Sequence, residues 1–100
     1  MIVHDEFIQA MRDLRLCVLK DVKGNSRLVQ PYGVFLTRQN KPMYCCFQVG
    51  GYSGSGEIPN WRNVSITEIK EVTITERGFK KRSDYNPDNR DLYYQWIERI

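Results

Sequence analysis

The chain has 100 residues, of which 41% are hydrophobic and 27% are charged. This length allows one domain over residues 1–100 with a modest core, and this composition excludes disordered, collagen-like and low-complexity proteins. The formal net charge of +3 permits an anionic partner but does not demand one.

The hydrophobic spacing predicts one short helix over residues 4–13. Phe7, Ile8 and Met11 fall at helical spacing, and acidic residues stand in the first turn. From residue 14 the hydrophobic period changes to two, which is typical of strands that are joined by tight turns such as KGN and RQNKP. The predicted strands cover residues 14–22, 26–37, 43–49, 61–66 and 71–77.

The last part of the chain reads as a connector and a helix. A basic connector is predicted over residues 78–85, within and after the stretch RGFKKR, and its usual role is a solvated link. A helix is predicted over residues 86–99, with Asn86 at the cap, Pro87 in the first turn and Trp96 on an apolar face. The order of helix, five strands and helix predicts a mainly β fold, a small and partly open barrel over residues 14–77.

The second predicted strand contains a break, Pro31-Tyr32-Gly33. Proline cannot donate to a strand ladder, and glycine tolerates the backbone angles of a sharp bend. We therefore expect a bulge that turns the strand and re-aims Tyr32. Tyr32 then either contacts a ligand or packs in the core or at its rim.

Two arginines and one strand face are candidates for ligand contact. Arg27 and Arg62 carry planar forks that suit phosphate groups. Tyr44 and Gln48 share one face of the third strand, where they could stack on a base and bond its edge. The alternative is a buried tyrosine with a satisfied hydroxyl, and Trp61, beside Arg62, favours a core position.

Catalysis and metal binding find no support in the sequence. His4 is the single histidine, and adjacent Cys45 and Cys46 would point to opposite faces of a strand, so no zinc site or nucleophilic set is formed. The loop GGYSGSG lacks the Lys-Ser/Thr and the following helix of a phosphate loop. We expect a non-enzyme without cofactor, whose cysteines, Cys17 included, are free thiols of a reducing compartment.

The N-terminus predicts a cytoplasmic protein. Its first residues carry acids where a signal peptide has a basic region, and no apolar run approaches the roughly 20 residues of a membrane helix. We therefore expect no membrane partner.

Several pieces of the chain occur together in one known family. They are an arginine ahead of a Pro-Tyr pair, an aromatic strand, a Gly/Ser-rich loop, a Trp-Arg pair and a later isoleucine: Arg27, Pro31-Tyr32, Met43-Tyr44-Cys45, Trp61-Arg62 and Ile69. In this arrangement the chain resembles the WYL domain over about residues 14–82, in particular short stand-alone bacterial members. The naming motif of that family, Trp-Tyr-Leu, is here Met-Tyr-Cys.

This resemblance implies a five-stranded, strongly bent barrel of the Sm-like or SH3-like kind. It also implies a regulatory or sensing module that binds nucleic acid or a nucleotide-like ligand. On this hypothesis single-stranded nucleic acid or a nucleotide meets Arg27, Tyr44 and Arg62 in one groove. The alternative is a protein–protein interaction module, self-associating as a homodimer or bound to a partner protein. On this alternative the chain itself would be an accessory protein of a phage-defence or mobile-element system.

Overall fold

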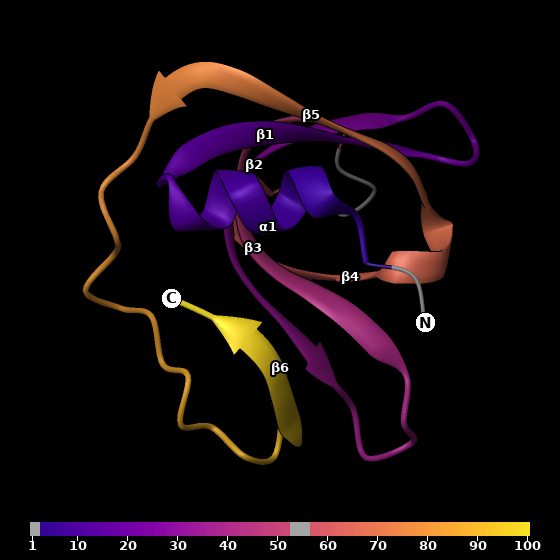
Figure 1. Cartoon of the computed structure of the whole chain (residues 1–100), viewed down its shortest axis with the longest axis vertical. Coiled ribbons are helices and arrows are strands. Elements are labelled where there is room, and N and C mark those ends of the chain that lie inside the picture. The colour runs from indigo at the N-terminus through magenta and orange to yellow at the C-terminus, as the bar shows by residue number, and fades with distance from the viewer. Residues whose placement is uncertain (1–2, 53–56) are drawn as a thin grey trace.

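The computed structural model describes residues 3–52 and 57–100. It contains one short helix and six strands (Figure 1). The elements are α1 (Asp5–Arg12), β1 (Arg15–Asp21), β2 (Ser26–Leu36), β3 (Pro42–Gly51), β4 (Asn60–Ser65), the 3-10 turn η1 (Ile66–Glu68), β5 (Ile69–Gly78) and β6 (Gln95–Arg99). In the described part of the chain, no helix has the length and apolar character needed to cross a lipid bilayer.

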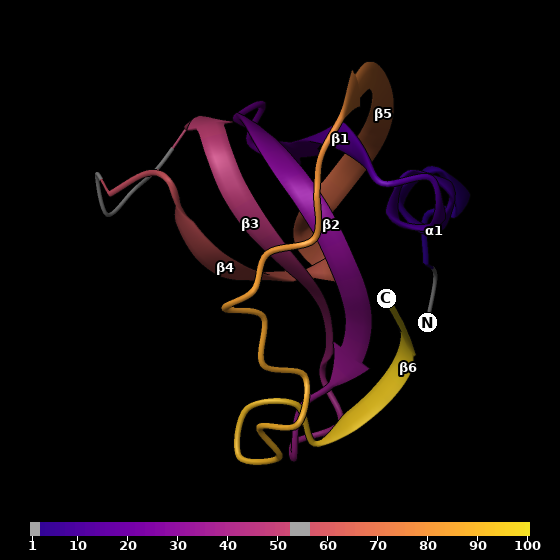
Figure 2. The same cartoon turned by 90° about the vertical axis from the view of Figure 1, so that its left-hand side faces the viewer.

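All six strands belong to one antiparallel sheet, which confirms the mainly β prediction. Five of them lie in the order β4-β3-β2-β1-β5, and β6 pairs with β2 outside that order. One edge of β2 is shared, because β1 pairs with its first half and β6 with residues 33–36. The sheet bends strongly along β2 and β3 (Figure 2) but does not close into a barrel.

The predicted bulge in β2 is confirmed. Pro31 is opposite Cys46 and Gly33 is opposite Cys45, so Tyr32 is the extra residue. Such a residue reverses the alternation of side chains beyond it. For this reason Val29 and Val34, five positions apart, face the same side of the sheet.

The two faces of the sheet carry separate cores. On one face, α1 covers a mainly aliphatic cluster: Phe7, Ala10, Cys17, Leu19, Val29, Val34, Tyr44, Cys46, Ile66, Ile69 and Val72. On the other face, the segment from residue 79 to the C-terminal strand covers an aromatic cluster. Its buried members are Tyr32, Phe35, Cys45, Phe47 and Tyr93, with Trp61, Phe79, Tyr85 and Trp96 packed against them.

The helix α1 forms where the period predicted it, and Phe7 attaches it to the sheet. The Phe7 ring stacks on the Tyr44 ring with 3.9 Å between centroids and 18° between planes. Just before the helix, the His4 backbone N–H donates to the Tyr44 hydroxyl at 2.8 Å. The helix ends where the chain turns at Leu14, whose φ is 54°. The buried face of α1 and the face of β3 that carries Tyr44 therefore form one packed layer.

The predicted C-terminal helix over residues 86–99 is wrong. Residues 95–99 form β6, and the segment before them consists of turns and bends. Trp96 faces the aromatic cluster while its neighbours Gln95 and Ile97 are exposed, a period of two rather than 3.6. The free edge of β2 beyond the bulge supplies the backbone partners, which a single-sequence pattern does not show.

The three cysteines are free and buried, with Cys45 and Cys46 on opposite faces of β3 as predicted. Burial raises the pKa of the Cys17 thiol to about 12 and that of Cys45 to about 11, from an ordinary value of 9.0. It raises the pKa of Cys46 well above that value too. The native thiols therefore stay protonated at neutral pH.

Iodoacetamide at pH 8 should alkylate the native protein at least about 100-fold more slowly than the urea-unfolded chain, since the thiolate is the nucleophile. Rapid labelling of the native protein would contradict this prediction.

The raised pKa values of the thiols also fix the sign of the pH effect on stability. The unfolded chain loses thiol protons first, so the contribution of the thiols to the free energy of unfolding is constant below about pH 9 and is lost as the pH rises through 11 to 12. Urea melts at pH 8 and 10.5 measure this, and a Cys45→Ala variant should show a smaller fall. An equal fall in Cys45→Ala and the wild type would contradict this second prediction.

Candidate functional site

The turn between β1 and β2 is organised by one carboxylate. The Asp21 side chain accepts the backbone N–H groups of Lys23 and Asn25 on Oδ1, both at 2.9 Å. Gly24, with a φ of 90°, completes the turn in a region that favours glycine. This arrangement leaves the other oxygen of Asp21, Oδ2, directed toward β2.

Arg27 binds that second oxygen of Asp21. Its Nη1 donates to Asp21 Oδ2 at 3.2 Å, and the side chains of Arg27 and Asp21 are only 20% and 11% exposed. Burial alone would raise the pKa of Asp21, but hydrogen bonds from Asn25 and Arg27 bring the pKa below its ordinary value. Asp21 is therefore a fixed negative charge that orients the Arg27 guanidinium.

A tyrosine ring lies on the other side of Arg27. The Arg27 guanidinium carbon is 5.3 Å from the centroid of the Tyr52 ring, within reach of a cation–π contact. Tyr52 follows β3, and its backbone N–H donates to the Ser26 carbonyl at 2.7 Å. The ring remains 46% exposed, so it can still offer surface to a ligand.

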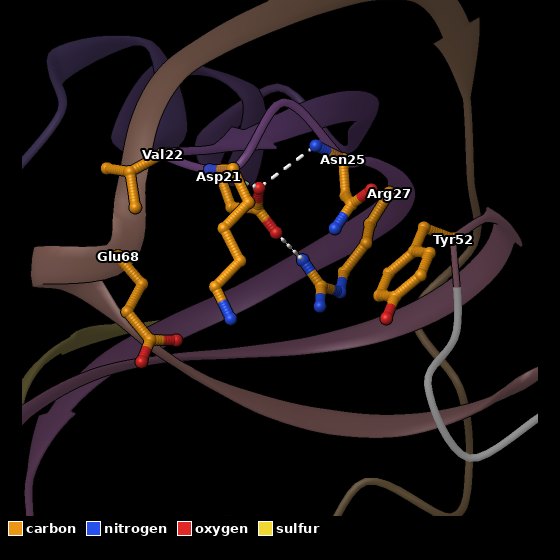
Figure 3. A pocket seen from close by; sticks show the side chains of 7 residues that line it. Asp21, Val22, Asn25, Arg27, Tyr52 and Glu68 are labelled. Carbon is orange, nitrogen blue, oxygen red and sulfur yellow. Dashed lines mark hydrogen bonds and ion pairs between the residues drawn. The ribbon is translucent and has the colours of Figure 1, made fainter.

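These groups surround an open cavity of about 200 Å³, hereafter the hairpin pocket (Figure 3). The β1–β2 turn, the end of β3 and η1 each form a wall, and the Val22 N–H ties the turn to η1 by donating to the Glu68 carbonyl at 3.0 Å. The lining residues are Asp21, Val22, Lys23, Asn25, Arg27, Tyr52 and Glu68. They supply two cations, two carboxylates, an amide and a phenol, all of which can bind a polar or charged ligand.

Gln48 holds the segment at the end of β3 that carries Tyr52. Its side chain is fully buried, and its Nε2 donates to the Gly50 carbonyl at 3.0 Å and to the Tyr52 carbonyl at 2.6 Å. Its Oε1 has no hydrogen-bond partner among the residues that the structure describes. Gln48 thus positions the end of β3, and with it Tyr52.

The structure does not bring Arg27, Tyr44 and Arg62 into one hollow. Tyr44 and Gln48 do share a face of β3, but α1 covers Tyr44, which is fully buried and bonded to His4. Burial raises the pKa of Tyr44 to about 12. The Arg62 guanidinium donates to the carbonyls of Glu57, at 2.5 Å, and of Trp61, at 3.4 Å. Of the three, Arg27 alone lines the hairpin pocket.

Tyr32 is also fully buried, inside the aromatic cluster. Its hydroxyl accepts the Arg82 backbone N–H at 2.8 Å, and its ring meets that of Trp61 edge-on at 4.8 Å. Arg82, from the basic stretch, lies 4.0 Å above the Phe47 ring and pairs with Asp84 at 2.8 Å. This part of the basic connector therefore packs against the cluster.

Sequence reasoning found Arg27 but missed the rest of the hairpin pocket. Tyr52 fell inside the glycine-rich loop, whose residues 53–56 lie outside the described residues. Asp21 carried a usable signal, because an aspartate that opens a turn ending in Gly-Asn commonly bonds the backbone two residues on. Glu68 carried none, since only the fold brings η1 beside the β1–β2 turn.

Over residues 3–52 and 57–100, no three His, Cys, Asp or Glu side chains stand together as a metal site. Comparison with protein-family models finds no matching family, and comparisons with curated protein sequences and with solved structures find no match.

Proposed function

We propose that this chain is a non-catalytic binding module that takes a nucleotide-like anion or single-stranded nucleic acid in the hairpin pocket. The observation that carries the proposal is a guanidinium fixed between Asp21 and an exposed tyrosine ring inside one cavity. A regulatory or sensing role for such a module agrees with the resemblance of the sequence to WYL domains.

Arg27 is the proposed anion contact. Arginine has five N–H donors, and among the described residues its guanidinium makes one hydrogen bond, to Asp21. The remaining donors are available for phosphate oxygens, and the fork is already oriented, so less conformational entropy is lost on binding. Lys23, in the same pocket, adds a second cation.

Tyr52 is the proposed stacking surface. A base stacked on an aromatic side chain gains about 1–3 kcal/mol whatever its identity. The cavity of about 200 Å³ is smaller than the roughly 300–1,000 Å³ typical of drug-sized ligands. The hairpin pocket therefore suits a single base or phosphate, and a longer single-stranded nucleic acid would extend beyond it.

Two cations predict a shallow dependence on salt. Neutralising two phosphates of a single strand gives a slope of about −1.4 in log affinity against log salt, or roughly a sevenfold loss between 50 and 200 mM. The carboxylates of Asp21 and Glu68 further limit the attraction for anions.

Arg27→Ala should weaken binding of a fluorescently labelled single-stranded oligonucleotide by at least about tenfold, because the variant removes the charge-assisted hydrogen bonds to phosphate. Fluorescence anisotropy at two salt concentrations measures the loss. Arg15→Ala is the matched control, since Arg15 is exposed at the other end of β1 and its removal makes the same charge change. Thermal melts confirm that both variants are folded.

Arg27→Lys should fall between the wild type and Arg27→Ala, because lysine keeps the charge and loses the planar fork. The proposal fails if the wild type binds neither oligonucleotide nor nucleotide at millimolar concentration. It fails equally if Arg27→Ala and Arg15→Ala weaken binding by the same factor, because that result assigns the effect to net charge.

A further inference from the structure

The hairpin pocket contains a carboxylate that a simple phosphate site does not need. Glu68 lines it from η1, and its negative charge would repel a phosphate group. Resting on the proposed function, we infer that the hairpin pocket selects a guanine base, with Glu68 as the residue that reads the base.

Glu68 reaches the hairpin pocket from a separate element, η1. Its backbone carbonyl accepts the Val22 N–H at 3.0 Å, which fixes η1 against the β1–β2 turn. Figure 3 shows the Glu68 carboxylate on one side of the hollow, and Arg27 and Tyr52 on the other. A nucleotide that enters the hollow therefore meets the carboxylate acceptors of Glu68 on one side and the Arg27 guanidinium on the other.

The two pocket carboxylates have different roles. Both oxygens of Asp21 are occupied, by the turn N–H groups and by Arg27. The Glu68 carboxylate has no hydrogen-bond or ion-pair partner within the described part of the chain. Glu68 is thus the acceptor available to a ligand, and Asp21 orients Arg27.

Guanine matches the Glu68 carboxylate. Its N1–H and N2 amino group are adjacent donors on one edge of the base. An ionised carboxylate accepts on both oxygens, so it suits these two adjacent donors, while Arg27 keeps its contact with the phosphate. In adenine and cytosine an acceptor nitrogen stands beside the amino group, and in uracil acceptors flank the single N–H, so each would face Glu68 with an acceptor.

Titration calorimetry with GMP, IMP and AMP tests the inference. GMP should bind at least about tenfold more tightly than AMP, because a bidentate pair discriminates by that factor or more. IMP, which lacks the N2 amino group, should fall between them. Glu68→Gln should reduce the preference for GMP over AMP to less than about threefold without weakening AMP.

Glu76→Gln is the matched control, because Glu76 is exposed on β5, outside the hairpin pocket, and the charge change is the same. This control should keep the full preference for GMP. Equal affinity for the three nucleotides, with loss on Arg27→Ala, would overturn guanine selection and leave the proposed function standing. A preference for GMP that survives Glu68→Gln would also overturn the role of Glu68. If no nucleotide and no oligonucleotide binds, both proposals fail.

Discussion

Replacing Gly33 with alanine is expected to lower the free energy of unfolding by about 2–3 kcal/mol. A Cβ at this position would collide with the Trp96 ring and lie 3.0 Å from Arg99 Cβ and from the Glu98 carbonyl oxygen. The Trp96 ring is not free to move aside. It packs against the rings of Phe35 and Tyr93, with centroids 5.6 Å and 4.5 Å away. Its Nε1 also donates to a backbone carbonyl at 2.7 Å.

The expected structural result is that β6 separates from β2. Urea denaturation measures the stability, and amide hydrogen exchange over residues 95–99 measures the separation. Gly50→Ala is the control, because a Cβ there would meet only Leu28 at 3.7 and 3.8 Å, ordinary contact distances. Its stability should stay within about 0.5 kcal/mol of the wild type.

A double variant locates the cause of the loss. If the clash with Trp96 is responsible, Gly33→Ala should cost less in a Trp96→Leu background than in the wild type. If Gly33→Ala has the stability of the wild type and unchanged amide hydrogen exchange in β6, then Trp96 can move aside and the close contacts around Gly33 do not limit stability.

Replacing Phe7 with alanine is expected to cost about 3–5 kcal/mol of unfolding free energy. Phe7 is fully buried, stacks on Tyr44 and is the largest side chain that α1 contributes to the core. A domain of this size has a total stability of about 5–15 kcal/mol, so the variant should be close to unfolding at 37 °C. Without the Phe7 ring, the Tyr44 ring should become partly accessible to solvent.

Urea denaturation at 10 °C keeps the Phe7→Ala variant within measurable range. Gln9→Ala is the control on the same helix, because Gln9 is exposed and its side-chain amide donates to the exposed Asp13 carboxylate. The control should change stability by no more than about 0.5 kcal/mol. A loss for Phe7→Ala of that same size would mean that α1 contributes little to the core.

Local patterns were enough to predict the features that depend on neighbouring residues. The bulge at Tyr32 follows from proline and glycine chemistry, and the turn at Gly24 follows from residues that tolerate tight turns. The strand β6 could not be found in this way, because its ladder forms with residues of β2 that are distant in the chain. An apolar segment with Pro87 near its start fits a helix equally well until that partner is known.

The candidate site shows the same division. The alternation of side chains along a strand predicted that Tyr44 and Gln48 share one face of β3. This alternation cannot show that α1 covers that face. Arg27 could be singled out for its chemistry alone. Its neighbours in the hairpin pocket, Tyr52 and Glu68, come from separate segments and meet only after the sheet has formed.

The shared edge of β2 has a consequence for the order of folding. The pairs Cys17–Val29 and Gly33–Arg99 join β2 to strands that are near and far in the chain, respectively. Closing the longer loop costs more entropy, so the nearby hairpin can form early while β6 docks late. Until that last step, the rings of Tyr32 and Phe35 lack their cover, and a newly synthesised chain in this state would be a natural target for a chaperone.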